Sequence, residues 1–133
     1  MTIRIVRLGT ERTPGEGVRI GTVRRPPRGV PKSEYATRNF YDAWLPNLAP
    51  SESLLKSAQD HLATGDARSW KTFVRKYRAE MKTPDNRALL ATLAALSHHA
   101  DFSVGCYCAD EARCHRSVLR ELLVERGARL SST

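Results

Sequence analysis

The residue types best suited to chemistry gather in one short segment near the C-terminus. The segment holds every cysteine of the 133-residue chain, followed directly by a histidine and an arginine: Cys106, Cys108, Cys114, His115 and Arg116. An apolar run precedes it and an amphipathic run follows it, so it is predicted to join a strand to a helix. Ligands of α/β proteins bind outside the carboxyl ends of strands, where helix N-termini present unpaired N–H groups. The sequence therefore predicts a thiol-containing site for an anion at this junction.

Each of these side chains has an expected role. Cys108 is the candidate reactive thiol, because a sulfur that faces a helix N-terminus has a lowered pKa. His115 is the candidate proton donor or acceptor, and Arg116 offers a guanidinium fork to a carboxylate or phosphate. Cys114 is interpreted as a resolving or a packing thiol, and Cys106 as a small core residue. These assignments leave open whether the protein is an enzyme.

A stiff basic loop at residues 24–31 is expected to cover the same site. Its prolines exclude helix, since proline lacks an N–H group and restricts the residue before it. Arg24 and Arg28 are predicted to bind the anion, which would be a nucleotide, nucleic acid or another phosphorylated or carboxylated compound. The alternative is a solvated loop with no ligand.

Two other uses of the cysteines are open. A structural zinc site is one alternative, because thiolates and an imidazole are typical zinc ligands. Its spacing is unfavourable, since zinc ligand pairs usually lie two to four residues apart on turns, whereas Cys106 and Cys108 are predicted to share a strand. A redox pair of Cys108 with Cys114 is the other alternative. No metal and no cofactor are expected.

A basic charge balance adds a second functional hypothesis. The formal net charge is +8, from 22 Lys and Arg residues against 14 Asp and Glu residues. Such a surface favours phosphates and nucleic acid. A stripe of cations on one predicted helix therefore marks either a nucleic-acid-binding module or an ordinary solvated face. The stripe comprises Arg68, Lys71, Arg75, Arg78 and Lys82.

Composition indicates a single globular domain over residues 1–133, with a short tail at 127–133. Hydrophobic residues make up 41% of the chain and charged residues 27%. No apolar run reaches the roughly 20 residues of a membrane helix. The first seven residues are too short and too charged for a signal peptide, and an odd, clustered set of cysteines does not suit a secreted disulfide framework. A cytoplasmic location without membrane contact is expected.

The elements that must position the site follow from periodicity. Strands are expected at residues 2–9, 18–24 and 102–108. A short helix is expected at 33–44, and longer helices at 52–63, after Asp66, after Thr83 and before Gly127. The expected core stripes are Trp70, Phe73, Val74, Tyr77 and Met81 on one helix and Leu89, Leu93 and Leu96 on the next. Alternation of strand and helix at the C-terminal end predicts a small α/β domain, with a mostly parallel sheet flanked by helices.

Several blocks of the chain resemble the family called domain of unknown function 488, in its YeaO-like branch. The blocks are RRPPRGV at residues 24–30, WLPNLAPS at 44–51, WKTF at 70–73, RKY at 75–77 and CHR at 114–116. The resemblance spans nearly the whole chain and implies a small α/β domain of bacterial or archaeal type. It also implies a shared pocket, without a defined reaction, lined by Arg24, Cys108, Cys114, His115 and Arg116.

The chain departs from the pattern of that branch at two places. The branch usually lacks cysteines in the closing motif, whereas this chain has the wider family's arrangement of Cys108, an acidic loop and Cys114. The family arginine at Arg24 is normally preceded by an aspartate, and Thr22 and Val23 stand there instead. A role for that carboxylate is therefore not expected.

Overall fold

The computed structural model, which describes residues 1–62 and 67–131, contains one parallel sheet of four strands. Their order is β1 (Ile3–Arg7), β4 (Phe102–Cys106), β2 (Val18–Gly21) and β3 (Ala43–Trp44). All pairings are parallel, and β4 is buried along its whole length between β1 and β2. The predicted α/β domain is confirmed, and the strand that leads to the cysteine segment is a central one.

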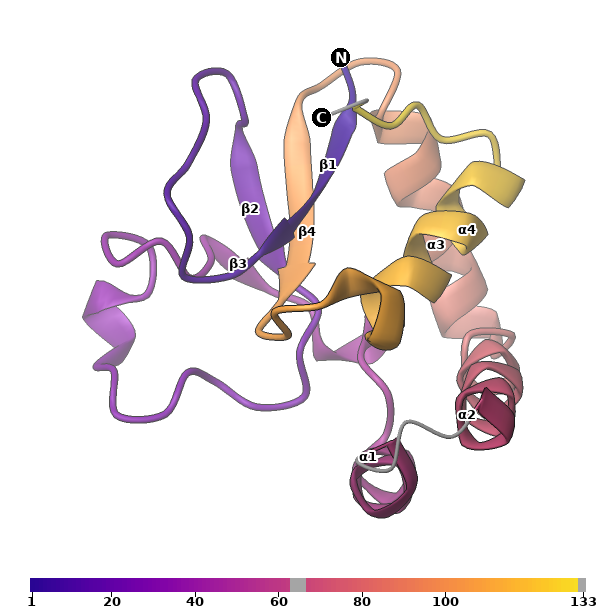
Figure 1. Ribbon diagram of the computed structural model, residues 1–133. Coiled ribbons are helices and arrows are strands. Elements are labelled where there is room, and N and C mark those ends of the chain that lie inside the picture. The colour runs from indigo at the N-terminus through magenta and orange to yellow at the C-terminus, as the bar shows by residue number, and fades with distance from the viewer. Residues whose placement is uncertain (63–66, 132–133) are drawn as a thin grey trace.

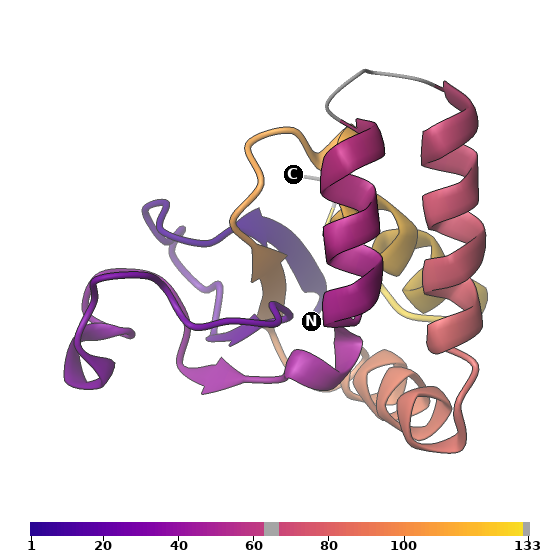
Figure 2. The ribbon, with the colours of Figure 1, turned by 90° about the horizontal axis from the view of Figure 1, so that it is seen from below.

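The helices gather on one side of this sheet. They are α1 (Glu52–Leu62), α2 (Ala67–Glu80), α3 (Pro84–Leu96) and α4 (His115–Glu125). In Figure 1, α2, α3 and α4 lie to one side of the strands, and the long β1–β2 and β2–β3 connections lie to the other. Figure 2 shows the same division from below, with α1 and α2 side by side. Within the described ranges, single-turn 3-10 helices also lie at Lys32–Glu34, Pro46–Leu48 and Glu111–Arg113.

The main core fills the space between the sheet and the helices. On α2 the rings of Trp70, Phe73 and Tyr77 stack in succession, with centroids 5.4 and 6.1 Å apart. The predicted stripe of α2 therefore faces the core as expected, with Phe73, Tyr77 and Met81 buried and Trp70 and Val74 packed against them. The predicted cap of this helix, Asp66, lies outside the described residues.

The predicted core face of α3 is only partly right. Thr83 caps the helix as expected, and Leu93 is buried, but Leu96 is 47% exposed. Leu90 and Ala94 take the inward positions with Leu93. At 100° per residue, Leu96 lies about 110° around the helix from the centre of this buried face.

The predicted helix at residues 33–44 is wrong. Asn39 adopts a left-handed conformation with φ 64°, which ends helical geometry, and the chain then enters β3. Tyr41 packs its ring on the sheet over Gly21, where a Cβ atom would lie 2.4 Å from the ring. Tyr35 and Phe40 pack against the same cluster as Tyr41, so these three rings cover the second face of the sheet, whereas Trp44 is exposed.

The C-terminal end of α4 and the chain that follows it are defined by backbone geometry and backbone contacts. Gly127, with φ 83°, follows the helix as the expected stop. The chain then runs beside β1, where the N–H of Ile3 donates to Arg129 and the N–H of Ser131 donates to Ile3. All three predicted strands are shorter than expected, because β1 spans only Ile3–Arg7, β2 ends at Gly21 and β4 ends at Cys106. Among the described residues, none of the helices is long and apolar enough to cross a bilayer.

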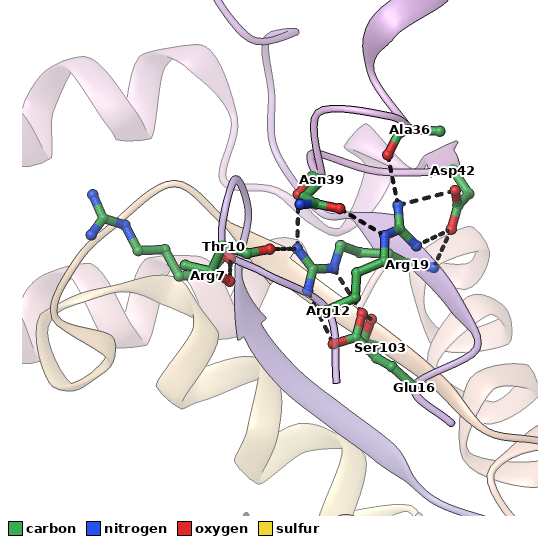
Figure 3. Close-up of polar contacts among 9 residues, drawn as sticks. All are labelled: Arg7, Thr10, Arg12, Glu16, Arg19, Ala36, Asn39, Asp42 and Ser103. Carbon is green, nitrogen blue, oxygen red and sulfur yellow. Dashed lines mark hydrogen bonds and ion pairs between the residues drawn. The ribbon is translucent and has the colours of Figure 1, made fainter. Parts of the chain in front are cut away.

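A buried ion pair anchors the long loops on the other face of the sheet (Figure 3). The side chain of Arg19 on β2 is 0% exposed, and its Nε and Nη2 atoms lie 2.9 and 3.0 Å from the carboxylate of Glu16. Its Nη1 donates to the carbonyls of Thr10 and Asn39, both at 2.8 Å. Ser103 of β4 donates to the same carboxylate. One guanidinium thus joins the β1–β2 and β2–β3 connections.

A second ion pair continues this network toward solvent. Asp42 accepts the backbone N–H of Arg19 and binds Arg12 at 2.7 and 3.1 Å. Arg12 also donates to the carbonyl of Ala36 (Figure 3). The β2–β3 connection is therefore held at both its middle and its end.

Removal of one partner of the buried pair is expected to destabilise the fold strongly. Arg19→Met or Glu16→Gln leaves an uncompensated buried charge, so the free energy of unfolding should fall by about 3–5 kcal/mol. Urea denaturation followed by circular dichroism measures this change. Glu52→Gln is the matched control, because the Arg25–Glu52 pair is exposed on both sides and contributes at most about 1 kcal/mol. Equal effects at the two pairs would contradict a structural role for Arg19.

Candidate functional site

The β4–α4 junction brings two cysteines together from opposite sides of a loop. Cys106 is the last residue of β4, and Cys114 is the N-cap of α4, with extended backbone angles of −127° and 152°. Their sulfur atoms lie 2.7 Å apart. Both residues are buried, being 1% and 2% exposed. The sulfurs are therefore fixed by a central strand and a helix end rather than by a free loop.

The loop between these cysteines is held by its acidic residues. Asp110 accepts the N–H of Ala112 at 3.0 Å and caps the 3-10 turn. Glu111 binds Arg120 of α4 through two hydrogen bonds of 2.7 and 2.9 Å. The acidic loop thus has a structural role, and it positions the residues that precede it.

Cys108 differs from the other two cysteines in its exposure. The predicted strand ends two residues before it, so Cys108 leaves the sheet and is exposed to solvent. The neighbouring thiols of Cys106 and Cys114 lower its pKa against the effect of burial, and the positive charge of Arg116 acts in the same direction as the thiols. Of the three thiols, the one that solvent reaches is therefore the one whose pKa is lowered.

The surroundings of the two buried thiols favour their protonated form. Hydrogen bonding to Cys108 and Cys114, together with burial, raises the pKa of Cys106. The neighbouring thiol of Cys106 lowers the pKa of Cys114, whereas that of Cys108 and burial raise it. The net effect is a rise, to a pKa of about 11. One of the two thiols donates its proton to the other across the 2.7 Å between their sulfur atoms.

His115 connects this cluster to β2 and to the core. Its Nε2 atom lies 2.7 Å from the carbonyl oxygen of Thr22, so Nε2 carries the proton, since a carbonyl only accepts. Its Nδ1 atom is then an acceptor, 3.6 Å from the sulfur of Cys114. Burial lowers the pKa of His115, and the ring of Tyr77 packs edge-on against it at 5.6 Å. The imidazole is therefore a neutral base aimed at Cys114.

Arg116 stands directly behind Cys108. It is buried, and its Nη2 atom donates to the carbonyl of Cys108 at 2.6 Å. Its Nε atom is buried and has no hydrogen-bond partner among the described residues. The structure thus buries Cys114, His115 and Arg116 at the start of α4, and Arg116 reaches the backbone of Cys108.

The two loop arginines lie in different surroundings. Arg24 donates to the carbonyls of Pro50 and Ala49 at 3.1 and 3.2 Å, which ties the loop to the start of α1. Arg28 is exposed and lines a hollow of 630 Å³. The structure therefore gives Arg24 a bracing role and leaves Arg28 at a surface that a ligand can reach.

This hollow adjoins the thiol cluster through Tyr107, the residue before Cys108. The other lining residues are Arg25, Pro26, Pro27, Arg28 and Phe40. The rings of Phe40 and Tyr107 meet edge to face at 6.3 Å, and the Tyr107 hydroxyl donates to the carbonyl of Arg25. Sequence reasoning missed Phe40 and Tyr107, although two aromatic residues beside basic and thiol motifs were a usable signal.

The same junction offers donors to a metal ion. The sulfurs of Cys106 and Cys114 and a ring nitrogen of His115 lie within 4.8 Å of one another. Thiolate and imidazole are ligands that zinc prefers, and a structural zinc site uses four of them. The described residues supply three donors in this group, so a fourth ligand would have to come from Cys108 or water.

The cationic stripe on α2 is partly neutralised. Arg78 forms ion pairs with Glu121 and Glu125 of α4, at 2.8 and 2.9 Å. Arg68, Lys71, Arg75 and Lys82 are exposed. The stripe is thus weaker as a phosphate track than its sequence indicates.

The chain matches a known protein family over most of its length. A family model described as DUF488-N3a, active DUF488-N3 subclade, matches residues 3–127. The searches of curated proteins and of solved structures returned no match.

Selective alkylation of Cys108 is expected from this geometry. In the native protein iodoacetamide should add a single label at Cys108, because Cys106 and Cys114 are buried. Since the pKa of Cys108 is lowered, its rate should change little between pH 8 and pH 6, whereas an ordinary thiol of pKa about 8.5 slows roughly 100-fold. Peptide mapping by mass spectrometry measures both, with urea-denatured protein as the control. First labelling at Cys106 or Cys114 would contradict the assignment.

Proposed function

The chain belongs to the DUF488 family, and we propose that it carries a reactive-thiol site for a small anionic substrate at the β4–α4 junction. The observation that supports this most directly is that Cys108 is exposed while Cys106 and Cys114 are buried, with the guanidinium of Arg116 2.6 Å from the carbonyl oxygen of Cys108. A thiolate, and not a thiol, is the nucleophile in cysteine chemistry. Placement in the YeaO-like branch stays a prediction.

In the proposed site Cys108 attacks an electrophilic atom of the substrate. Cys106 and Cys114 stabilise the thiolate before the attack, and His115 exchanges a proton with Cys114 through Nδ1. Arg116 holds the carbonyl of Cys108 and keeps an unpaired N–H group beside it. The residues that bear the chemistry are thus held by β4, α4 and the carbonyl of Thr22.

The adjoining hollow supports a substrate that combines an anion with a flat ring. Arg25 and Arg28 provide positive charge at its rim, and Phe40, Tyr107 and the prolines provide apolar and aromatic surface. Guanidinium groups bind phosphate and carboxylate, and aromatic rings stack on bases. A nucleotide satisfies both requirements, and a phosphorylated or carboxylated metabolite satisfies the first.

Protection from alkylation tests this substrate class. Adenosine monophosphate should slow the labelling of Cys108 more than an equal concentration of inorganic phosphate, because the phosphate lacks the ring. Arg28→Ala should raise the protecting concentration about tenfold, the equivalent of about 1.4 kcal/mol. Arg87→Ala, an exposed arginine on α3, is the matched control and should leave protection unchanged. No protection by either probe would contradict an anion site beside Cys108.

The α2 stripe carries the second candidate function, a nucleic-acid-binding module. Exposed Lys71 and Arg75 on one helix face favour it. The double variant Lys71→Glu, Arg75→Glu spares the ion pairs of Arg78 and should leave nucleotide protection of Cys108 intact. Salt-sensitive retention of RNA by the wild type that this variant loses would instead support the nucleic-acid function.

A further inference from the structure

We propose that Cys106, Cys114 and His115 form a binding site for a divalent metal ion of the zinc type. The donor atoms of these three residues all lie within 4.8 Å of one another, and all three residues are buried. The inference goes beyond the proposed function and does not rest on the reactivity of Cys108. It concerns the buried side chains of the β4–α4 junction.

The imidazole of His115 is oriented as a metal ligand would be. Its Nε2 atom donates to the carbonyl oxygen of Thr22 at 2.7 Å, which leaves Nδ1 with the lone pair that a metal ion needs. Histidines that bind metals usually donate their other ring N–H to a backbone carbonyl or a carboxylate, because this contact fixes the ring and its tautomer. Thr22, directly after β2, thus supplies the outer contact of the site.

The distances between the donor atoms suit a tetrahedral ion after one adjustment. Metal bonds of about 2.3 Å to sulfur and about 2.0 Å to nitrogen give edges of about 3.6 Å between sulfur and nitrogen and about 3.8 Å between two sulfurs. The sulfur of Cys114 lies 3.6 Å from Nδ1 of His115, which matches the first edge. The sulfurs of Cys106 and Cys114 lie 2.7 Å apart, so an ion must separate them by about 1 Å more. Rotation about one Cα–Cβ bond supplies this movement.

Regular backbone structure holds the three donors in place. Cys106 ends β4, and its carbonyl accepts the N–H of Leu8 at 2.8 Å. Cys114 is the N-cap of α4, and its N–H donates to the carbonyl of Glu111 at 3.1 Å. His115 is the first residue of the helix. Donors carried by a central strand and a helix end are preorganised, which favours a specific site over a chance encounter of side chains.

The donor types select the class of ion. Thiolate sulfur and imidazole nitrogen favour zinc and similar ions, whereas magnesium and calcium prefer oxygen. On binding, Cys106 and Cys114 release their protons to solvent, and the two thiolate charges cancel the charge of a divalent cation. An uncompensated charge would be costly here, because both cysteines belong to a buried cluster with Leu8, Val23 and Tyr41.

The pairing of the cysteines in the structure removes the objection that their spacing raised against zinc. That objection concerned Cys106 and Cys108 as partners on one strand, but β4 ends at Cys106, and Cys108 is exposed. Cys106 is paired instead with Cys114, across a loop that Asp110 and Glu111 hold. Three protein donors leave the fourth tetrahedral position to water or to a group of a bound substrate.

A bound ion has two consequences for the junction. It ties the end of β4 to the start of α4, and it stabilises the fold because it binds the native chain in preference to the unfolded one. Metal binding also excludes the proton exchange proposed between Cys114 and His115, since both use Nδ1. The ion-bound protein therefore keeps Cys108 exposed but lacks that exchange.

Cobalt(II) and zinc(II) test the site in the intact wild-type protein. The protein is freed of metal with a chelator, kept reduced with a phosphine and titrated with Co²⁺. We expect one ion per chain, with the charge-transfer absorption of cobalt–thiolate bonds and the visible bands of tetrahedral cobalt. Zn²⁺ should displace the cobalt and raise the melting temperature, because it binds the folded state. A wild-type protein that forms no thiolate-bound cobalt in excess Co²⁺ would overturn the proposal.

Substitutions identify the donors. Cys106→Ser, Cys114→Ser and His115→Gln should each weaken binding by more than the roughly 10–100-fold that loss of an outer contact costs. His99→Gln, at an exposed histidine after α3, and Cys108→Ser are the matched controls and should leave the affinity and the cobalt spectrum unchanged. A weaker thiolate absorption in Cys108→Ser would overturn the assignment of the three buried donors. Circular dichroism verifies that each variant is folded, and the wild-type spectrum and melting shift depend on none of them.

The outcomes separate this inference from the proposed function. Fast, selective alkylation of Cys108 in a protein that binds neither ion would overturn the metal site and leave the reactive thiol standing. Tight binding of the ion by a protein whose Cys108 reacts as an ordinary thiol, with and without metal, would support the metal site and overturn the reactive thiol.

Discussion

The structure depends on the burial of β4 between two parallel neighbours. Every peptide group of a buried strand needs a hydrogen-bond partner, and β1 and β2 supply these partners in register on either side. The ladders continue beyond the strands, because Leu8 donates to the carbonyl of Cys106 and Thr22 donates to that of Gly105. The end of β4 is thus fixed from both sides, and the carbonyl of Thr22 is directed where His115 can bind it.

The two faces of this sheet are covered in different ways. One face is apolar and packs against the helices, which bury most of the core. The other face has little side-chain volume at Gly105 and Gly21, where a Cβ atom would lie 2.5 Å from a β1 carbonyl or 2.4 Å from Tyr41. Long loops close over it, and Arg19 with Glu16 holds them there. Because the loops that shape the hollow beside Cys108 start on this face, the ion pair also supports the site.

Much of this arrangement could be predicted from residue order. The apolar alternation ending at Cys106 and the amphipathic run from His115 to Gly127 placed a strand and a helix around the cysteines, and the structure has both. Their meeting point followed from the geometry of parallel sheets. The exposure of Cys108 did not follow, because the pattern does not tell where a buried strand stops pairing.

Other features had no sequence signal. β3 is only two residues long, too short for a period, and its position depends on the reversal at Asn39. Arg19 alternates with apolar residues as a solvent-facing side chain would, yet it is buried because a distant loop brings Glu16 to it. His115 binds a backbone carbonyl oxygen. Every residue has such a group, so the sequence does not indicate which one His115 contacts.

The strand order also constrains how the chain is made. β1 and β2 are the first two strands synthesised, but they do not pair with each other, and β4 lies between them. β2 can pair with β3 early, but β1 has no strand neighbour among the described residues until β4 has been made. Until then the N-terminal segments have unpaired edges, and α1 to α3 lack the surface they cover. Completion of the sheet therefore waits for β4, and Cys106 takes its place beside Cys114 only after that strand has entered between β1 and β2.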